Sequence, residues 1–130
     1  MKIFEFKTTQ EKDVIIIEDV LVDDYKVKLI LDTGASTTVI DSNSLYVLGY
    51  FPKDFYGHTE FETASGVIEA NYLKIKKFKC LGIEINNFQI CTYDFAVSGI
   101  TPEFDGMLGI DFFQNNKICI DFIKSELTIS

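Results

Sequence analysis

Residues 29–40 read Leu29-Ile30-Leu31-Asp32-Thr33-Gly34-Ala35-Ser36-Thr37-Thr38-Val39-Ile40. In this stretch an apolar run leads into an acid, a glycine follows two residues later, and a β-branched run resumes. Apolar and β-branched runs of this length, separated by turn residues, are typical of buried strands. Aspartate and glycine both favour turns, so Asp32 has an ordinary explanation as a turn residue. The second explanation is chemical, because a carboxylate among apolar neighbours has the environment of many catalytic acids.

The rest of the chain continues this pattern. Short apolar or alternating runs are separated by turn residues, which predicts an all-β fold with a closed or strongly curved sheet. The expected strands cover residues 2–7, 14–20, 25–31, 37–40, 67–78, 83–93, 106–110, 117–122 and 126–129. Hairpin turns are expected at residues 22–24, 64–66 and 124–125. Two short helices are expected, one capped by Asp41 or Ser42 and ending at Gly49, the other over residues 111–115.

Size and charge limit the classes of function. The 130 residues suffice for one domain, spanning residues 1–130, but not for two lobes of ordinary size. The net charge of −8 argues against nucleic-acid binding, which is driven by clustered lysine and arginine. The densest basic stretch mostly alternates with apolar residues and is expected on the solvent face of a strand; it consists of Lys74, Lys76, Lys77 and Lys79.

Other features of the sequence do not predict a functional site. No run of about 18 apolar residues is present, and the first residues lack a signal-peptide core, so no membrane contact and a cytoplasmic location are expected. The odd number of cysteines, without zinc-site spacing, predicts free buried thiols at Cys80, Cys91 and Cys119. His58 is the one histidine and is expected in a loop. Because no nucleophile motif accompanies it, neither a Ser or Cys triad nor a metal or other cofactor is expected.

Asp32 and its neighbours fit the demands of hydrolysis by a pair of aspartates. Two carboxylates must share one proton, so that one accepts a proton from water while the other donates a hydrogen bond to the scissile carbonyl. Gly34 allows two backbones to approach closely, and the hydroxyl of Thr33 can bond to a partner loop. Asp32 is the one acid of the chain in an Asp-Thr-Gly or Asp-Ser-Gly sequence. The pair therefore requires a second copy of the chain.

Three stretches together resemble the retropepsin-like aspartic proteases, the single-domain homodimeric relatives of pepsin. The first, Asp32-Thr33-Gly34-Ala35-Ser36 after its apolar strand, resembles the active-site signature of that family. The second, Asp105-Gly106-Met107-Leu108-Gly109-Ile110-Asp111-Phe112, is similar to the hydrophobic-hydrophobic-Gly strand that passes beside the active-site loop. The third is the closing hairpin at residues 118–129. Together they are far more specific than any one of them alone.

The resemblance implies an acid-protease β-barrel whose single lobe forms a homodimer and hydrolyses peptide bonds of extended polypeptides. It implies Asp32 as the catalytic residue, in an active-site loop completed by Thr33, Gly34, Ala35 and Ser36. It also implies a flap that closes over the substrate, formed by Thr63, Ala64, Ser65, Gly66 and Val67. The supporting strand would be formed by Met107, Leu108, Gly109 and Ile110. The implied partners are a second copy of the chain and a peptide or protein substrate.

These observations lead to an expected pH optimum, an alternative function and an open question about strand pairing. Ala35 stands where pepsin-like lobes often have a serine that can hydrogen-bond to the carboxylate, so an activity optimum nearer mild acid or neutrality than strong acid is expected. The alternative function is a catalytically silent module for dimerisation or peptide binding, against which the retained Asp32-Thr33-Gly34 argues. The sequence also leaves open whether residues 126–130 pair with a partner, as in retroviral members, or within their own subunit.

Overall fold

Strands make up most of the chain, and the computed structural model describes residues 1–11, 14–63, 66–99 and 103–130. The strands are β1 (Lys2–Glu5), β2 (Lys7–Thr8), β3 (Ile15–Val22), β4 (Tyr25–Leu31), β5 (Val39–Asp41), β6 (Gly57–Thr63), β7 (Gly66–Cys80), β8 (Ile83–Tyr93), β9 (Gly106–Leu108), β10 (Ile118–Asp121) and β11 (Glu126–Ile129). The helical segments are α1 (Ser42–Val47) and the 3₁₀ turns η1 (Pro52–Asp54) and η2 (Ile110–Phe113). The prediction of an all-β fold is confirmed.

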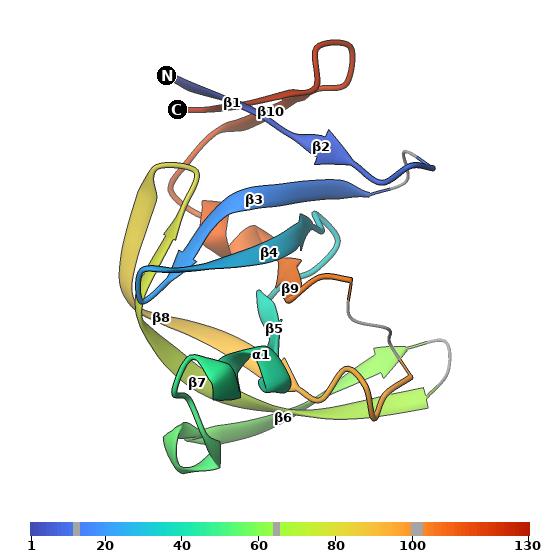
Figure 1. Cartoon of the computed structure of the whole chain (residues 1–130), viewed down its shortest axis with the longest axis vertical. Helices are drawn as coiled ribbons and strands as arrows, with labels where there is room; N and C mark the ends of the chain where they lie inside the picture. The colour runs from blue at the N-terminus through green and yellow to red at the C-terminus, as the bar shows by residue number, and fades with distance from the viewer. Residues whose placement is uncertain (12–13, 64–65, 100–102) are drawn as a thin grey trace.

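The larger sheet closes on itself. Its strand order is β2-β3-β4-β9-β5-β8-β7-β6, and an additional pairing joins β3 to β7. The register of β3 on β4 shifts between Ile17 and Val20. Such an irregularity bends a strand and increases its twist, and beyond it residues 20–22 pair with β7. The curled sheet in Figure 1 is therefore a closed barrel, as the curved all-β pattern predicts.

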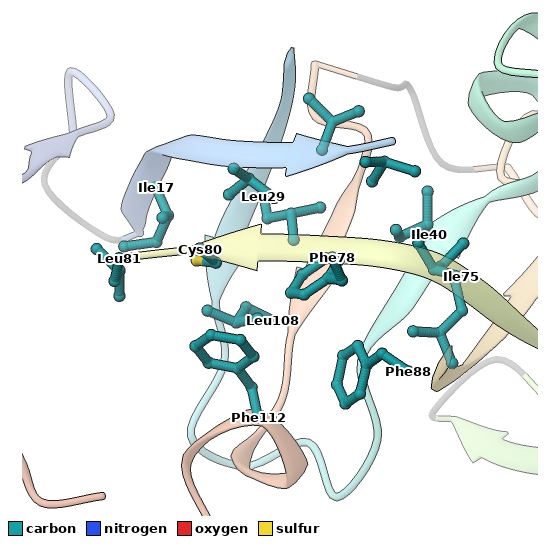
Figure 2. Close-up of a cluster of buried hydrophobic side chains, with 14 of the residues drawn as sticks. Ile17, Leu29, Ile40, Ile75, Phe78, Cys80, Leu81, Phe88, Leu108 and Phe112 are labelled. Atoms are coloured by element: carbon teal, nitrogen blue, oxygen red, sulfur yellow. The ribbon is translucent and has the colours of Figure 1, made fainter. Parts of the chain in front are cut away.

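The hydrophobic core fills this barrel. Leu29 of β4, Phe78 of β7 and Leu108 of β9 are fully buried and lie together in Figure 2. Phe112 of η2 meets Phe78 edge to face, with ring centroids 5.5 Å apart. Complete burial of one such side chain stabilises a fold by about 1.5–3 kcal/mol. The core thus fixes β4 and β9, the two strands that lead to Asp32 and pass beside it.

The chain termini form a second, smaller sheet. Its strand order is β1-β11-β10, with β11 in the middle. Lys2 pairs with Ile129 on one side of β11, and Ile118 pairs with Ile129 on the other. Both edges of the last strand are therefore occupied within its own subunit. The second of the two arrangements that the sequence left open is the one observed.

The cap and glycine signals in the sequence predicted both ends of the first helix. Asp41 caps α1, its carboxylate accepting a hydrogen bond from Asn43 N at 3.3 Å, and the chain leaves the helix through Gly49 at φ +96°. The second expected helix is observed as the 3₁₀ turn η2, which begins at Ile110 and ends at Phe113. The 3₁₀ turn η1 was not expected.

Other expectations need correction. The strand expected over residues 2–7 divides at the buried Phe6, because β1 and β2 belong to different sheets. The strand expected over residues 106–110 ends at Leu108. His58 lies in β6, a strand that was not expected, and not in a loop. Cys80 and Cys91 are buried free thiols as expected, whereas Cys119 is exposed. Among the described residues, no helix is long and apolar enough to cross a membrane.

Candidate active site

Asp32 lies at the point where β4 leaves the barrel. Its backbone N–H donates to Leu108 O at 3.0 Å and extends the contact between β4 and β9 by one residue. The chain then turns tightly, because Gly34 N donates to Asp32 Oδ1 at 3.0 Å and Ala35 N donates to Asp32 O at 3.1 Å. Asp32 itself is half-buried, while Thr33 and Gly34 are exposed. The carboxylate is therefore fixed in place, and the tip of its loop stays accessible.

Strand β9 passes between the strands on either side of this loop. It runs parallel to β4 and antiparallel to β5. A Cβ atom on Gly106 would lie 2.0 Å from Val39 O, and one on Gly109 would lie 2.8 Å from Ala35 O. No side chain fits at such distances. Gly106 is thus explained by the close approach of β9 to β5, and Gly109 by the close approach of the chain after β9 to residues 35–37 of the loop that carries Asp32.

A buried threonine ties the far end of the loop to η2. The Thr38 hydroxyl donates to Asp111 Oδ1 at 2.7 Å and accepts a hydrogen bond from Gly109 N at 3.1 Å. Thr38 N donates to the other carboxylate oxygen, Asp111 Oδ2, at 2.9 Å. Ile110 N also donates to Ala35 O at 2.9 Å. Residues 32–38, hereafter the Asp32 loop, are therefore held at their start by Leu108 of β9 and at their end by Gly109 and Asp111, which follow β9.

Opposite the Asp32 loop lies a hairpin of two long strands. We call β6 together with residues 66–72 of β7 the flap hairpin; it lies at the end of the molecule away from the chain termini (Figure 1). Phe61 and Ile68 are paired across the hairpin, and both line a cavity of about 230 Å³. The whole lining consists of Asp32, Gly34, Ala35, Ser36, Thr37, Val39, Phe61, Ile68, Tyr93 and Met107. The cavity thus combines one carboxylate with a largely apolar wall.

The predicted site residues divide into three groups. Asp32, Gly34, Ala35, Ser36 and Met107 line the cavity. The exposed Thr33 and Ile110 and the buried Leu108 and Gly109 lie outside the cavity lining. In the flap hairpin, Gly66 adopts φ +132°, a conformation that favours glycine, and Val67 is 60% exposed and outside the cavity. The expected tip residues Ala64 and Ser65 lie outside the described residues, and Thr63 pairs with Gly66 at the end of β6.

Sequence reasoning missed other residues of the site. Phe61 and Tyr93 face the cavity and contact one another, with ring centroids 6.4 Å apart. Both are aromatic residues on strands of alternating exposure, a pattern that fits any half-buried sheet. Thr38 and Asp111 are 73 positions apart, so no local pattern could have joined them. The one local indication was that Asp111 belongs to the second signature, directly after Gly109 and Ile110.

A cysteine lies close behind the loop but is not suited to attack a substrate. Burial, and after it the charge of the Asp111 carboxylate, raises the pKa of the Cys91 thiol from 9.0 to about 11. Since the thiolate is the reactive form, this thiol is inert at neutral pH. Burial, followed by the charge of Asp41, also raises the pKa of Tyr93 above its usual range. Among the described residues that line the cavity, Asp32 is the one with a carboxylate.

An aspartate at the end of a buried strand, beside a glycine-bearing strand and beneath a hairpin, defines the class of single-lobed aspartic proteases. A family model described as aspartyl protease matches residues 18–112, and the chain belongs to this family. No curated protein matches the chain.

Solved structures agree with this family. A retropepsin-like aspartic protease from Rickettsia conorii aligns with a TM-score of 0.74 at 20% identity, over 100% of this chain and 99% of that one. The EIAV protease, complexed with the inhibitor HBY-793, aligns with a TM-score of 0.59 at 25% identity, over 84% of this chain and 92% of that one. The retroviral protease-like domain of Ddi1 from Leishmania major gives 0.59 at 18% identity, over 88% and 87%. The retropepsin-like fold expected from the sequence is thus confirmed.

Proposed function

We propose that this protein is an aspartic endopeptidase that acts as a homodimer, with Asp32 and its copy in the second subunit as the catalytic pair. The observation that carries the proposal is the presence of a single carboxylate, Asp32, in the described lining of an apolar cavity beneath a hairpin. Hydrolysis by this class of enzyme requires two carboxylates that share a proton. A two-fold axis beside the exposed tip of the Asp32 loop supplies the second one.

In the proposed reaction, the two Asp32 carboxyl groups carry one proton between them. The ionised group accepts a proton from water as the water oxygen attacks the scissile carbonyl carbon. The protonated group transfers its proton to the carbonyl oxygen, which becomes a hydroxyl of the tetrahedral intermediate. The group that took the proton from water then transfers it to the leaving nitrogen as the C–N bond breaks. The other group regains a proton from a hydroxyl of the intermediate, so the pair again carries one proton. The titration belongs to the pair and not to either residue.

Hydrogen bonds of the Asp32 loop support this assignment. Gly34 N donates to Asp32 Oδ1, so one carboxylate oxygen is already oriented in the single subunit. Thr33 is exposed, so it is accessible to a second subunit. Preorganised donors of this kind lower the cost of holding two carboxylates together.

The cavity wall indicates which substrates would be preferred. Val39, Phe61, Ile68 and Met107 surround the space next to Asp32 with apolar atoms. We therefore infer a preference for a large apolar side chain next to the scissile bond, since its burial there contributes about 25 cal/mol per Å². The rest of an extended peptide would bind by main-chain hydrogen bonds along the flap hairpin.

Cleavage of an unstructured protein by the wild type and by Asp32→Asn tests the proposal. The wild type should cleave and elute as a dimer in gel filtration, whereas Asp32→Asn should elute as the same dimer without activity. Asp24→Asn is the matched control, because Asp24 is an exposed acid in the β3–β4 turn and pairs with Lys77. Cleavage by Asp32→Asn at the wild-type rate would refute the mechanism. A dimeric wild type with no cleavage and no thermal shift from a hydroxyl-bearing transition-state mimic would favour the silent module.

A further inference from the structure

Three potential metal ligands lie on the flap hairpin, outside the residues assigned to catalysis. His58 and Glu60 are two positions apart on β6, so their side chains share one face of the strand. Glu69 of β7 pairs directly with Glu60 across the hairpin. One potential ligand atom from each of these three side chains lies within 4.8 Å of the others, and all three residues are exposed.

This face is the outer face of the flap hairpin. Phe61 and Ile68, the cross-strand pair next to Glu60 and Glu69, line the cavity above Asp32. Successive side chains of a strand point to opposite faces, so the glutamates are directed away from the cavity. The three ligands are therefore independent of the catalytic chemistry.

Without an ion, this arrangement is unfavourable. Glu60 and Glu69 are like charges directly opposite one another, which destabilises an antiparallel pair. Neither carboxylate has a cationic partner among the ion pairs of the described residues. The protein already has a net charge of −8. A bound cation would remove the repulsion and use all three side chains.

We propose that His58, Glu60 and Glu69 bind a divalent transition-metal ion of the zinc type on the outer face of the flap hairpin. One imidazole nitrogen and two carboxylate oxygens are ligands that zinc accepts, with water in the remaining position. Ligands bound to zinc at about 2.0–2.2 Å lie at most about 4.4 Å apart, so small rotations of exposed side chains suffice. The imidazole disfavours Ca²⁺ and Mg²⁺, which select oxygen ligands.

An ion at this site would link the two strands of the flap hairpin through side chains. His58 and Glu60 belong to β6 and Glu69 to β7, so the metal would restrain their separation. We expect slower opening of the hairpin over the cavity and slower peptide cleavage when zinc is bound. This consequence rests on the proposed function, whereas metal binding itself does not.

Calorimetric titration of the metal-free protein with Zn²⁺ tests the site. All variants carry Cys119→Ser, because an exposed thiol can bind zinc by itself. We expect one Zn²⁺ per chain, and binding weakened at least about tenfold by His58→Asn, Glu60→Gln or Glu69→Gln. The matched control is Glu5→Gln, because Glu5 also lies opposite a glutamate, Glu126, on a paired strand.

Two further measurements make the result decisive. Co²⁺ should give a visible absorption spectrum that Glu5→Gln retains and His58→Asn loses. Thermal unfolding should show a Zn²⁺-dependent increase in Tm that requires all three ligands, with no comparable effect of Ca²⁺. Zinc binding that survives all three ligand substitutions, or that Glu5→Gln weakens equally, would overturn the proposal. Loss of peptide cleavage alone would not bear on it, since none of these measurements depends on activity.

Discussion

The Asp32 loop and the flap hairpin border the same cavity but are held by different forces. The Asp32 loop is fixed by close backbone contact with β9 and by the Thr38–Asp111 hydrogen bonds. The flap hairpin is a two-stranded ribbon with one exposed face and, at Gly66, a glycine at positive φ with no atom near its Cβ position. The Asp32 carboxylate is therefore held by several neighbouring segments, whereas residues 66–70 of the flap hairpin pair with β6 alone among the described strands. Substitutions of the same chemical kind should therefore have unequal effects in the two regions.

The largest difference is expected from added methyl groups. Gly106→Ala places a Cβ 2.0 Å from Val39 O, which should lower the free energy of unfolding by at least about 3 kcal/mol or prevent folding. Gly66→Ala on the flap hairpin meets no atom and costs only its unfavourable φ, about 1 kcal/mol. Urea unfolding of both variants measures the contrast. Equal stability of the two would contradict the close packing described for β9.

The next effect concerns the hydroxyl of Thr38. Thr38→Val keeps the shape of the side chain but leaves Gly109 N without its acceptor and removes one of the hydrogen bonds to Asp111. We expect a loss of about 2 kcal/mol, because a buried donor would remain unpaired. Thr59→Val in β6 is the control and should change stability by less than about 0.5 kcal/mol. Denaturation midpoints that fail to separate these variants would show that the network does not hold the loop.

A third prediction concerns the dependence of stability on pH, which involves the side chain of Tyr50. Tyr50 is buried, donates a hydrogen bond to Asp23 and accepts one from Lys76 N at 2.9 Å. Burial, and then the hydrogen bond to Asp23, raises the pKa of Tyr50 from 10.0 to about 12. The unfolded chain therefore loses this proton first, and the folded state loses stability as pH rises from about 10 to about 12.

Comparison with a phenylalanine variant isolates that contribution. Across this pH range the stability of the wild type should fall by up to about 2 kcal/mol more than that of Tyr50→Phe, which has no proton to lose. Unfolding in urea at pH 9 and above measures the two slopes. Tyr25→Phe, at a tyrosine that is 62% exposed, should keep the slope of the wild type. Parallel slopes for wild type and Tyr50→Phe would refute the assignment.

The smallest effect on stability is expected at the flap hairpin wall. Phe61→Ala removes a half-buried ring from the cavity and should cost about 1 kcal/mol in unfolding free energy. The substitution should lower kcat/KM more for peptides with a bulky apolar side chain next to the scissile bond than for peptides with alanine there. Glu62→Ala changes an exposed residue of the same strand and should leave kcat/KM for both kinds of peptide unchanged. A uniform loss for both peptides in Phe61→Ala would contradict the proposed pocket.

Much of the fold could be predicted because local chemistry determines it. Tyr25–Leu31, Ile83–Tyr93 and Glu126–Ile129 have the bounds that their apolar patterns indicate, and Asp41 and Gly49 border α1. Strand β6 was missed because its residues are mostly polar and its conformation depends on pairing with β7. The position of β11 between β1 and β10 could not be predicted, since strand order is set by contacts between the two ends of the chain.

The candidate site was predictable to a similar extent. The segment around Asp32 is local, so the sequence located it together with the glycines of β9. Thr38 with Asp111, and Glu60 with Glu69, are partners only through the register of distant or paired strands. Periodicity shows which face a residue occupies but not which residue stands opposite. The single Asp-Thr-Gly segment predicts a second subunit, but neither kind of signal shows which surfaces the two chains would share.

Mixing wild-type and Asp32→Asn chains tests whether one active centre requires Asp32 from two subunits. After exchange at equal concentrations, about a quarter of the dimers contain two wild-type chains, so activity per wild-type chain should fall to about half. Asp24→Asn chains are expected to be active, so the same mixture should keep the activity per total chain at the wild-type value. If activity per wild-type chain stays constant with Asp32→Asn while co-purification of differently tagged chains confirms mixed dimers, each subunit works alone and the shared catalytic pair is wrong.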